Sequence, residues 1–274
     1  MNKILIFLVI ITLSGLLNLP FFLKQKYFEL KFLNIGQGDA TLIRSPSNCY
    51  ILVDGGPPQK LLQTVREHLP TLERKIDLVI LTHPHLDHMA GLLELLSKYQ
   101  FKEVWLTGIN YASAEYQHFL EQLYSQHLKT KIRYITEPTK TKTCQIDISV
   151  LMPVTSLIST DIENLNNSSF ILQLKIKNTK ILLTGDAEEE QELELLALYS
   201  EQILASQIMK AGHHGSRTSN SLSLLKVVAP KYLVISSGQK NTYGHPHFET
   251  IQKADQLKII IKRTDQLKDI SFFF

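Results

Sequence analysis

The stretch LTHPHLDHMAG, Leu81 to Gly91, decides how this chain is interpreted. It overlaps the end of an apolar run rich in β-branched residues, Ile76 to Thr82, which predicts a buried strand. Within six positions it then places four ligand-type side chains, His83, His85, Asp87 and His88. Imidazole and carboxylate groups together bind borderline divalent metals such as zinc or manganese. We therefore expect a metal-binding loop at the C-terminal end of a strand, where α/β sheets open their clefts.

The composition is that of a globular protein. The chain has 274 residues, of which 44% are hydrophobic and 20% charged. A formal net charge of +3 permits an anionic substrate without predicting one, and no aromatic and basic stripe typical of nucleic-acid binding stands out. The two cysteines, Cys49 and Cys144, exclude a disulfide framework and a cysteine-rich zinc site. A single bridge between them is an alternative outside the cytoplasm, but we expect two unpaired buried thiols.

The N-terminal segment differs from the rest of the chain. Ile4 to Leu23 carries no charge and is long enough to cross a bilayer as a helix. No cleavage site for a signal peptidase is evident near its end, so we expect residues 1–26 to be an uncleaved single-pass membrane anchor. Lysines flank the segment on both sides, which leaves its orientation open. A buried first helix of the folded domain is the alternative.

The remainder, residues 27–274, predicts one catalytic domain without linkers or repeats. Its early segments alternate as antiparallel strands do, and later ones alternate between strand and helix, which predicts an α/β (α+β) domain with two packed sheets and helices outside. The expected strands are 27–34, 40–44, 49–54, 76–82, 103–106, 131–135, 145–151, 170–177, 180–184, 207–211, 232–236, 258–262 and 269–274. The expected helices are 57–69, 89–99, 112–128, 188–199 and 248–256.

Four further predicted strands also run into ligand-type residues. CYILVDGG ends in Asp54, and KILLTGD ends in Asp186. IMKAGHHGS leads to the pair His213 and His214, and YLVISSGQKNTYGHPH leads to His245 and His247. Each residue taken alone could cap a turn or a helix. Together with the metal loop they predict one shared site.

The order of these motifs resembles the metallo-β-lactamase fold superfamily of metallohydrolases. The residues within these motifs resemble, more specifically, the metallohydrolase domain of the ComEC competence proteins. The pieces that carry the likeness run from Phe32 to Gln266: FLNIGQGDATLI, ILVDGG, LTHPHLDHMAGL, ILLTGD, MKAGHHGSRTS, YGHPH and KRTDQ. The resemblance implies an αββα four-layer sandwich with one or two divalent metal ions, zinc or manganese, along one edge.

The resemblance also implies roles for individual residues. His83 and His85 would bind one metal, Asp87 and His88 the second, and Asp186 would bridge them. Asp54 would support the metal loop by orienting a ligand histidine. Asp39, His214 and Ser216 are expected to support the site or bind substrate. Catalysis would depend on Asp87, Asp186 and His245.

The sequence departs from the superfamily pattern at one place. Many members carry another histidine about twenty residues before the bridging aspartate, but here that segment reads NLNNSSF, residues 164–170. His213 and His245 are the candidates to replace it, with His213 favoured over His214. If His245 reaches no metal, it could bind a phosphate or protonate a leaving group. Otherwise the first metal site is weak or empty.

The resemblance implies a phosphodiesterase or nuclease acting on DNA during uptake, with the catalytic domain outside the cytoplasm. A single anchor cannot conduct DNA, so a separate channel protein is an expected partner. One alternative is hydrolysis of a small phosphodiester, such as a phosphocholine ester or cyclic nucleotide. The other is a non-catalytic, membrane-anchored binding module, which the missing histidine favours.

Overall fold

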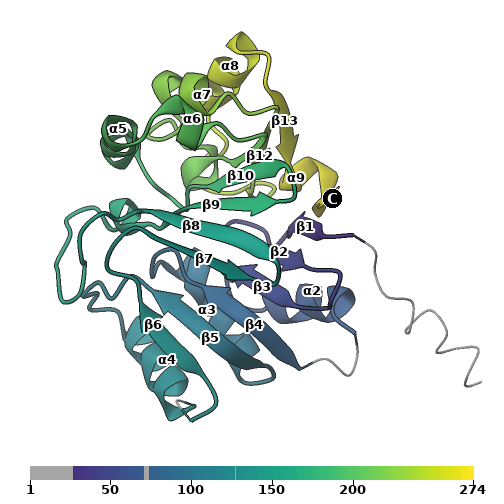
Figure 1. Cartoon of the computed structure of the whole chain (residues 1–274), viewed down its shortest axis with the longest axis vertical. Helices are drawn as coiled ribbons and strands as arrows, with labels where there is room; N and C mark the ends of the chain where they lie inside the picture. Colours follow the sequence, from purple (N-terminus) through teal and green to yellow (C-terminus); the bar gives the residue numbers. More distant parts are fainter. Residues whose placement is uncertain (1–26, 71–73, 127) are drawn as a thin grey trace, which may run out of the picture.

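The computed structural model describes residues 27–70, 74–126 and 128–274. Two seven-stranded mixed sheets pack face to face, and helices cover their outer faces (Figure 1). The predicted anchor lies outside the described residues. Within those residues, no helix is long and apolar enough to span a membrane.

The first sheet has the strand order β14-β1-β2-β3-β4-β5-β6. Its β14, β1, β2 and β3 pair antiparallel, whereas β3 to β6 pair in parallel. The strands are β1 (Glu29–Phe32), β2 (Thr41–Arg44), β3 (Tyr50–Val53), β4 (Lys75–Ile80), β5 (Gln100–Leu106), β6 (Lys131–Tyr134) and β14 (Ile270–Phe273). The parallel strands place their C-terminal ends at one edge of the sheet.

The second sheet has the order β13-β12-β11-β10-β9-β8-β7. It repeats the plan of the first, with β7 to β10 antiparallel and β10 to β13 parallel. The strands are β7 (Thr139–Thr143), β8 (Ile146–Met152), β9 (Ile171–Ile176), β10 (Thr179–Leu183), β11 (Ile208–Lys210), β12 (Tyr232–Ile235) and β13 (Ile260–Arg263).

Three apolar clusters hold the layers together. One joins the first sheet to its helices, one fills the space between the sheets, and one joins the second sheet to its helices. The helices are α2 (Leu61–His68), α3 (Leu86–Leu96), α4 (Ala114–Ser125), α5 (Glu189–Leu198), α6 (Glu201–Leu204), α7 (Leu222–Val228), α8 (Phe248–Gln256) and α9 (Thr264–Leu267). The described residues thus form the helix–sheet–sheet–helix sandwich that the sequence predicts.

Several boundaries differ from the prediction. The helix after the metal loop begins at Leu86 and not at Met89, so Asp87 and His88 lie in its first turn. Strand β7 was not predicted, because TKTKT carries no large apolar residue and alternates between half-buried and exposed positions. Helices α6 and α7 were also not predicted, since each is too short to show a clear amphipathic period.

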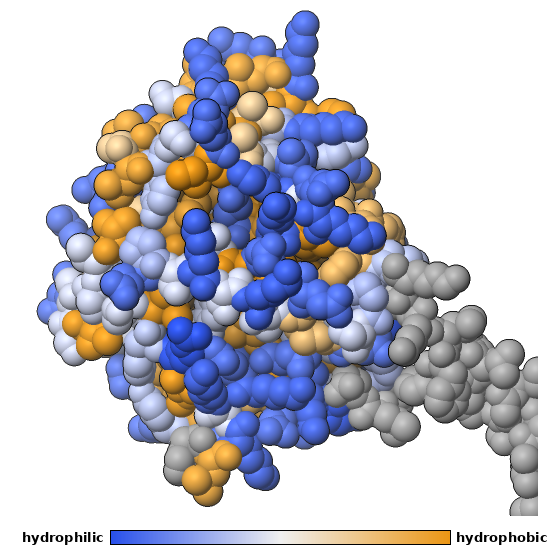
Figure 2. Space-filling model, in the orientation of Figure 1, coloured by the Kyte–Doolittle hydropathy of each residue, from blue (hydrophilic) through white to orange (hydrophobic). Residues whose placement is uncertain are grey.

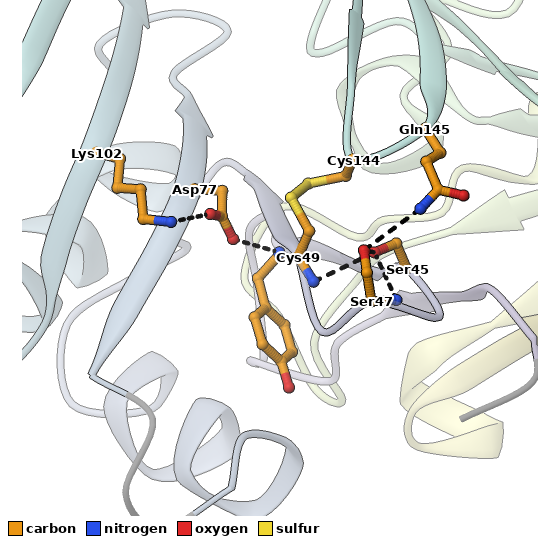
Figure 3. Close-up of a disulfide and its surroundings, with 8 residues drawn as sticks. Ser45, Ser47, Cys49, Asp77, Lys102, Cys144 and Gln145 are labelled. Atoms are coloured by element: carbon orange, nitrogen blue, oxygen red, sulfur yellow. Dashed lines mark hydrogen bonds and ion pairs between the residues drawn. A yellow bond between two sulfur atoms is a disulfide. The ribbon is translucent and has the colours of Figure 1, made fainter. Parts of the chain in front are cut away.

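The prediction of two unpaired thiols is wrong. Cys49 and Cys144 form a disulfide across a sequence separation of 95 residues (Figure 3). Cys49 precedes β3 in the first sheet and Cys144 follows β7 in the second, so the bridge ties one edge of the two sheets together. Ser47 and Gln145 add a hydrogen bond of 3.5 Å beside it. Sequence reasoning missed the pairing because only the three-dimensional packing brings these distant turns together.

Candidate metal centre

The metal loop joins β4 to α3. His83 and His85 lie in the loop itself, where His83 Nε2 is 3.1 Å from His85 Nδ1. The His83 and His88 rings are 4.2 Å apart between centroids. Burial, together with the neighbouring His88, holds the pKa of His83 well below its usual value. His83 is therefore a neutral imidazole, the protonation state that binds a metal.

Asp186 lies in the turn that follows β10. Its backbone N–H donates to Ser169 Oγ at 3.0 Å. Gly185, with φ of +52°, makes the turn possible, since a Cβ there would lie 2.9 Å from the Ser169 side chain. The turn aims the carboxylate at two rings: Asp186 Oδ2 is 3.2 Å from His88 Nε2 and 3.3 Å from His214 Nε2.

Asp39 reaches the same point from the GQGDA loop. Its N–H donates to the carbonyl oxygen of Asp87 at 3.1 Å, which lays this loop directly on the metal loop. Only glycine fits at position 38, because φ is +130° and a Cβ would lie 2.2 Å from the Asp87 oxygen. The sequence predicted Asp39 as a supporting or substrate residue, and the structure brings it into contact with the ligand-type side chains.

Four buried residues gather their ligand atoms within 4.8 Å of one another: Asp39, His88, Asp186 and His214. Among the described residues, buried His88 Nε2 and Asp39 Oδ1 make no well-aligned hydrogen bond, although each lies within ion-pair distance of a neighbour, Asp186 Oδ2 at 3.2 Å and His214 Nδ1 at 3.3 Å. Such unsatisfied atoms are rare in native proteins unless an ion or water completes them. Oxygen and imidazole donors converging on one point fit a divalent metal ion. This donor set implies divalent metal binding.

Asp54 holds the far side of His88. Its Oδ2 accepts from His88 Nδ1 at 2.9 Å and from the Thr82 hydroxyl at 2.8 Å, while Oδ1 accepts the Thr82 N–H. Burial alone would lower the pKa of His88, but Asp186 and Asp54 raise it well above its usual value. Asp54 therefore lies where the sequence predicts a residue that orients a ligand histidine.

The histidine pair is turned by its backbone. His213 and His214 have φ angles of +47° and +54°, the left-handed region that non-glycine residues seldom adopt. His214 is buried against the four-residue group, with Nδ1 3.3 Å from Asp39 Oδ1. His213 turns away, and its Nδ1 lies 3.0 Å from Glu188 Oε1. The structure thus places His214 in the group and not the favoured His213, whose role as a ligand stays a prediction.

Lys210 is a site residue that sequence reasoning missed. Its ammonium group is buried between Asp39 and Asp186, pairs with the Asp39 carboxylate, and donates to the Gly185 carbonyl at 2.7 Å. Burial alone would lower the pKa of Lys210, but the two carboxylates raise it. Lys210 offsets part of the negative charge beside the ligands. The signal was present, because Lys210 stands in MKAGHHGS at the end of the otherwise apolar β11.

An open cleft of about 320 Å³ leads to this group. Its walls include predicted residues (His85, Asp87, Asp186, His213, His214, His245) and residues not predicted (Gln37, Leu86, Tyr111, Asn166, Tyr243). Asn166 belongs to the segment where the family's histidine is absent, and its Nδ2 donates to Glu188 Oε1 at 2.9 Å. Ser216 is buried, and its hydroxyl lies 2.9 Å from Thr218 Oγ1.

His245 lies on the cleft wall but outside the four-residue group. Its Nδ1 is 3.3 Å from Gln37 Nε2, and its ring stacks on Tyr243 at 5.8 Å. Burial and the neighbouring His214 and His213 lower the pKa of His245 to about 4. Its imidazole is therefore uncharged near neutral pH.

The chain is similar to proteins of known family. The profile of the metallo-beta-lactamase superfamily matches residues 33–239. ComE operon protein 3 of Bacillus subtilis is 27% identical over 261 residues, covering 89% of this chain and 33% of that protein. Recombination protein 2 of Haemophilus influenzae is 25% identical, covering 88% of this chain and 28% of that protein.

This chain therefore spans about a third of the length of these curated relatives. Among solved structures, the metallo-beta-lactamase fold protein YhfI of Bacillus subtilis superposes with a TM-score of 0.59 at 13% identity, covering 91% of this chain and all of that one. The chain belongs to the metallo-beta-lactamase superfamily, as a metal-dependent hydrolase with relatives among the competence proteins.

Proposed function

We propose that the protein is a metal-dependent phosphodiesterase that cleaves DNA. The observation that carries this is the buried group of Asp39, His88, Asp186 and His214 at the floor of an open cleft. In hydrolases of this kind, a bound divalent ion lowers the pKa of a water molecule from ~15.7 toward about 7 and neutralises charge on a phosphate. The remaining roles belong to side chains around the ligands.

Asp87 is the candidate to orient the attacking water. Its side chain is 35% exposed toward the cleft, and Oδ2 lies 3.1 Å from His214 Nε2. Burial would raise the pKa of Asp87, but the hydrogen bond from His214 holds it well below its usual value. The group is therefore a carboxylate at working pH, able to accept a hydrogen bond from water.

His245 is the candidate to contact the phosphate. Because its pKa is about 4, the imidazole of His245 is not protonated to the cation near neutral pH. An uncharged imidazole suits metal ligation or a hydrogen bond to a phosphate oxygen better than protonation of a leaving group. His245 is fixed in place by Asn241, whose side chain bonds both the N–H and the carbonyl of His245.

DNA is the preferred substrate for two reasons. The relatives include a protein named for competence, Competence protein ComA of Neisseria gonorrhoeae. In addition, Tyr111 and Tyr243 line the cleft, and Tyr243 is 66% exposed. Exposed aromatic rings beside a phosphate site offer stacking surfaces for bases. The second candidate is a small phosphodiester, which the modest cleft volume favours. The third candidate is a non-catalytic binding module.

The proposal includes the setting of the enzyme. Residues 1–26 form the anchor and residues 27–274 the catalytic domain, with the domain outside the cytoplasm. The Cys49–Cys144 disulfide supports this location, because structural disulfides persist mainly in oxidising compartments. We also propose a separate channel protein as the partner for DNA transport.

The test is hydrolysis by the purified full chain loaded with manganese or zinc. Linear DNA and bis-p-nitrophenyl phosphate are assayed side by side. Cleavage of both, abolished in Asp87→Ala and retained in the exposed-surface control Asp255→Ala, supports the proposal. Turnover of only the small ester would favour the second candidate. A folded, metal-loaded protein that cleaves neither substrate would contradict both enzymatic functions and favour the non-catalytic binding module.

A further inference from the structure

The strand directions give the molecule two opposite edges. The cleft lies where β4, β10 and β11 end. The opposite edge is made by the N-terminal ends of β3 to β6 in one sheet and of β10 to β13 in the other. The Cys49–Cys144 disulfide joins the two sheets at this second edge. We call the surface there the basal face and define it by Arg74, Lys75, Lys98, Lys102, Lys129 and Lys131, all exposed.

The basal face is strongly basic. Lys102 pairs with Asp77, and Lys131 pairs with Glu103. Within residues 27–70, 74–126 and 128–274, neither Lys98 nor Lys129 has an acidic partner. Arg74 lies over the ring of Tyr99. A hollow of about 640 Å³ is lined by four cations, Arg74, Lys75, Lys98 and Lys102, together with Asn48, Gln100 and the single carboxylate of Asp77. In Figure 2, the lower half of the view, where β4 and β5 lie in Figure 1, is largely hydrophilic.

The second sheet continues the same charge. Lys175 near the end of β9, Lys177 in the β9–β10 turn and Lys231 before β12 are exposed at this edge. On the cleft side, Glu188 before α5 lies 3.0 Å from His213 of the cleft wall.

Exposed apolar side chains stand beside the basic ones. β1 begins at Glu29, which pairs with Phe273 of β14, so both chain ends of the described domain meet at the basal edge. The rings of Tyr27 and Phe273 pack edge to face at 5.1 Å, with 45% and 58% of the residues exposed. Leu128, next to Lys129, is 89% exposed. Aromatic rings mixed with lysines are typical of surfaces at the boundary between water and lipid.

The chain joins the domain at this edge. The sequence that precedes Tyr27 contains the uncharged segment Ile4 to Leu23, followed by Lys24 and Lys26. A face that carries both basic and aromatic side chains therefore adjoins a segment with the length and composition of a membrane span. Nucleic acid fits this face less well, because a strand bound there would lie on the edge opposite the cleft.

We propose that the basal face docks on the membrane surface and binds the anionic headgroups of phospholipids. The hollow between Arg74, Lys75, Lys98 and Lys102 takes a headgroup phosphate, and Tyr27 and Phe273 enter the interfacial layer. Docking in this way holds the cleft on the side of the domain that faces away from the bilayer. The proposal does not depend on which ester the cleft hydrolyses.

The test measures lysine accessibility in the full chain. The protein is reconstituted into nanodiscs of phosphatidylcholine alone or of phosphatidylcholine and phosphatidylglycerol in equal parts. Lysines are labelled with a water-soluble amine-reactive ester and quantified by peptide mass spectrometry. Lys98, Lys102 and Lys129 should label about threefold or more slowly in the anionic discs. Lys60 and Lys240, which lie near the cleft edge, should label equally in both.

A pair of matched variants separates docking from a general effect of charge. Lys98→Glu with Lys129→Glu should abolish the slower labelling of Lys102, whereas Lys60→Glu with Lys240→Glu should leave it intact. Equal labelling in the two kinds of disc would overturn the proposal. So would protection of the same lysines by a single-stranded oligonucleotide with none by anionic lipid.

Discussion

His214 Nε2 lies 3.1 Å from Asp87 Oδ2, although the two residues are 127 positions apart in the sequence. One comes from the first turn of α3 on the first sheet, and the other follows β11 of the second. The contact shows that the site is completed only when the two sheets are packed together. The first sheet supplies Asp39, Asp87 and His88, whereas Asp186 and His214 come from the second.

Asp186→Asn should remove metal binding and activity together. Asp186 Oδ2 faces both His88 and His214, and an amide is a much poorer metal ligand than a carboxylate. We expect hydrolysis to fall by more than about 100-fold and the bound metal, measured by elemental analysis, to be lost. Asp255→Asn, on the exposed face of α8, is the control. Full metal occupancy in Asp186→Asn would contradict the assignment of Asp186 as a metal ligand.

Asp54→Asn should weaken metal binding without removing a ligand. Asp54 accepts hydrogen bonds from His88 and from Thr82, and so fixes the ring that faces Asp186. Substitution of such supporting carboxylates typically lowers metal affinity by about 10- to 100-fold. Competition against a chromophoric chelator measures the change. An unchanged affinity in a folded variant would show that Asp54 serves only the turn before Gly55.

Tyr243→Ala should act on the substrate and not on the metal. Tyr243 is exposed at the cleft and stacks on His245. Loss of one base-stacking ring should raise the KM for single-stranded DNA by about 5- to 150-fold. Hydrolysis of bis-p-nitrophenyl phosphate should be little affected. Tyr27→Ala, at the opposite edge, is the matched control. Equal effects on both substrates would point to a structural role.

Replacing Cys49 and Cys144 by serine should lower stability. The bridge closes a long loop, with a sequence separation of 95, and its loss should cost about 2–5 kcal/mol in the free energy of unfolding. Denaturant titration of the wild type with and without reductant, beside the double variant, measures this. Reductant should destabilise the wild type and leave the variant unchanged. A wild type insensitive to full reduction would contradict the prediction.

The pair formed by His68 and Asp269 should give a pH-dependent contribution to stability. Asp269 Oδ2 is 2.6 Å from His68 Nε2, and Oδ1 accepts the Asn34 N–H at 2.7 Å. Burial alone would raise the pKa of Asp269, but these hydrogen bonds lower it below the ordinary value of 3.8.

A carboxyl group whose pKa is lower in the folded state stabilises the fold above its unfolded pKa. The stabilisation should therefore be present at pH 5–7 and disappear as the pH falls below about 4. Urea titrations of the wild type and Asp269→Asn should differ at neutral pH and converge in acid. A constant gap down to pH 3 would contradict this linkage.

Much of the site could be predicted from sequence because its residues follow recognisable strands. Asp54, Asp186 and the metal loop each end a run of buried apolar residues, and parallel strands bring such ends to one edge. Lys210 lies inside the predicted strand 207–211 but was missed as a site residue, because a single lysine in a short strand is usually exposed. Its partners Asp39 and Asp186 are distant in sequence, so no local pattern announces the pairing.

Which of His213 and His214 faces the metal centre could be decided only from the backbone conformation. Adjacent residues on a turn point in different directions, and two consecutive positive φ angles decide which ring faces Asp186. The disulfide needed the packing of two turns from different sheets. The polar strand β7 was not predicted, because its own residues carry no apolar pattern. It forms only by pairing with β8 in the folded sheet.

The disulfide and the metal centre cross-link the two sheets at opposite edges of the sandwich. Cys49–Cys144 fastens the sheets at the basal edge, and Asp39, His88, Asp186 and His214 bring residues of both halves together at the other. Between these two edges, the apolar cluster that fills the space between the sheets holds the sandwich closed. Loss of the metal together with reduction of the disulfide should therefore loosen both edges of a sandwich whose centre stays packed, so that proteolysis begins in the edge turns and not in the strands.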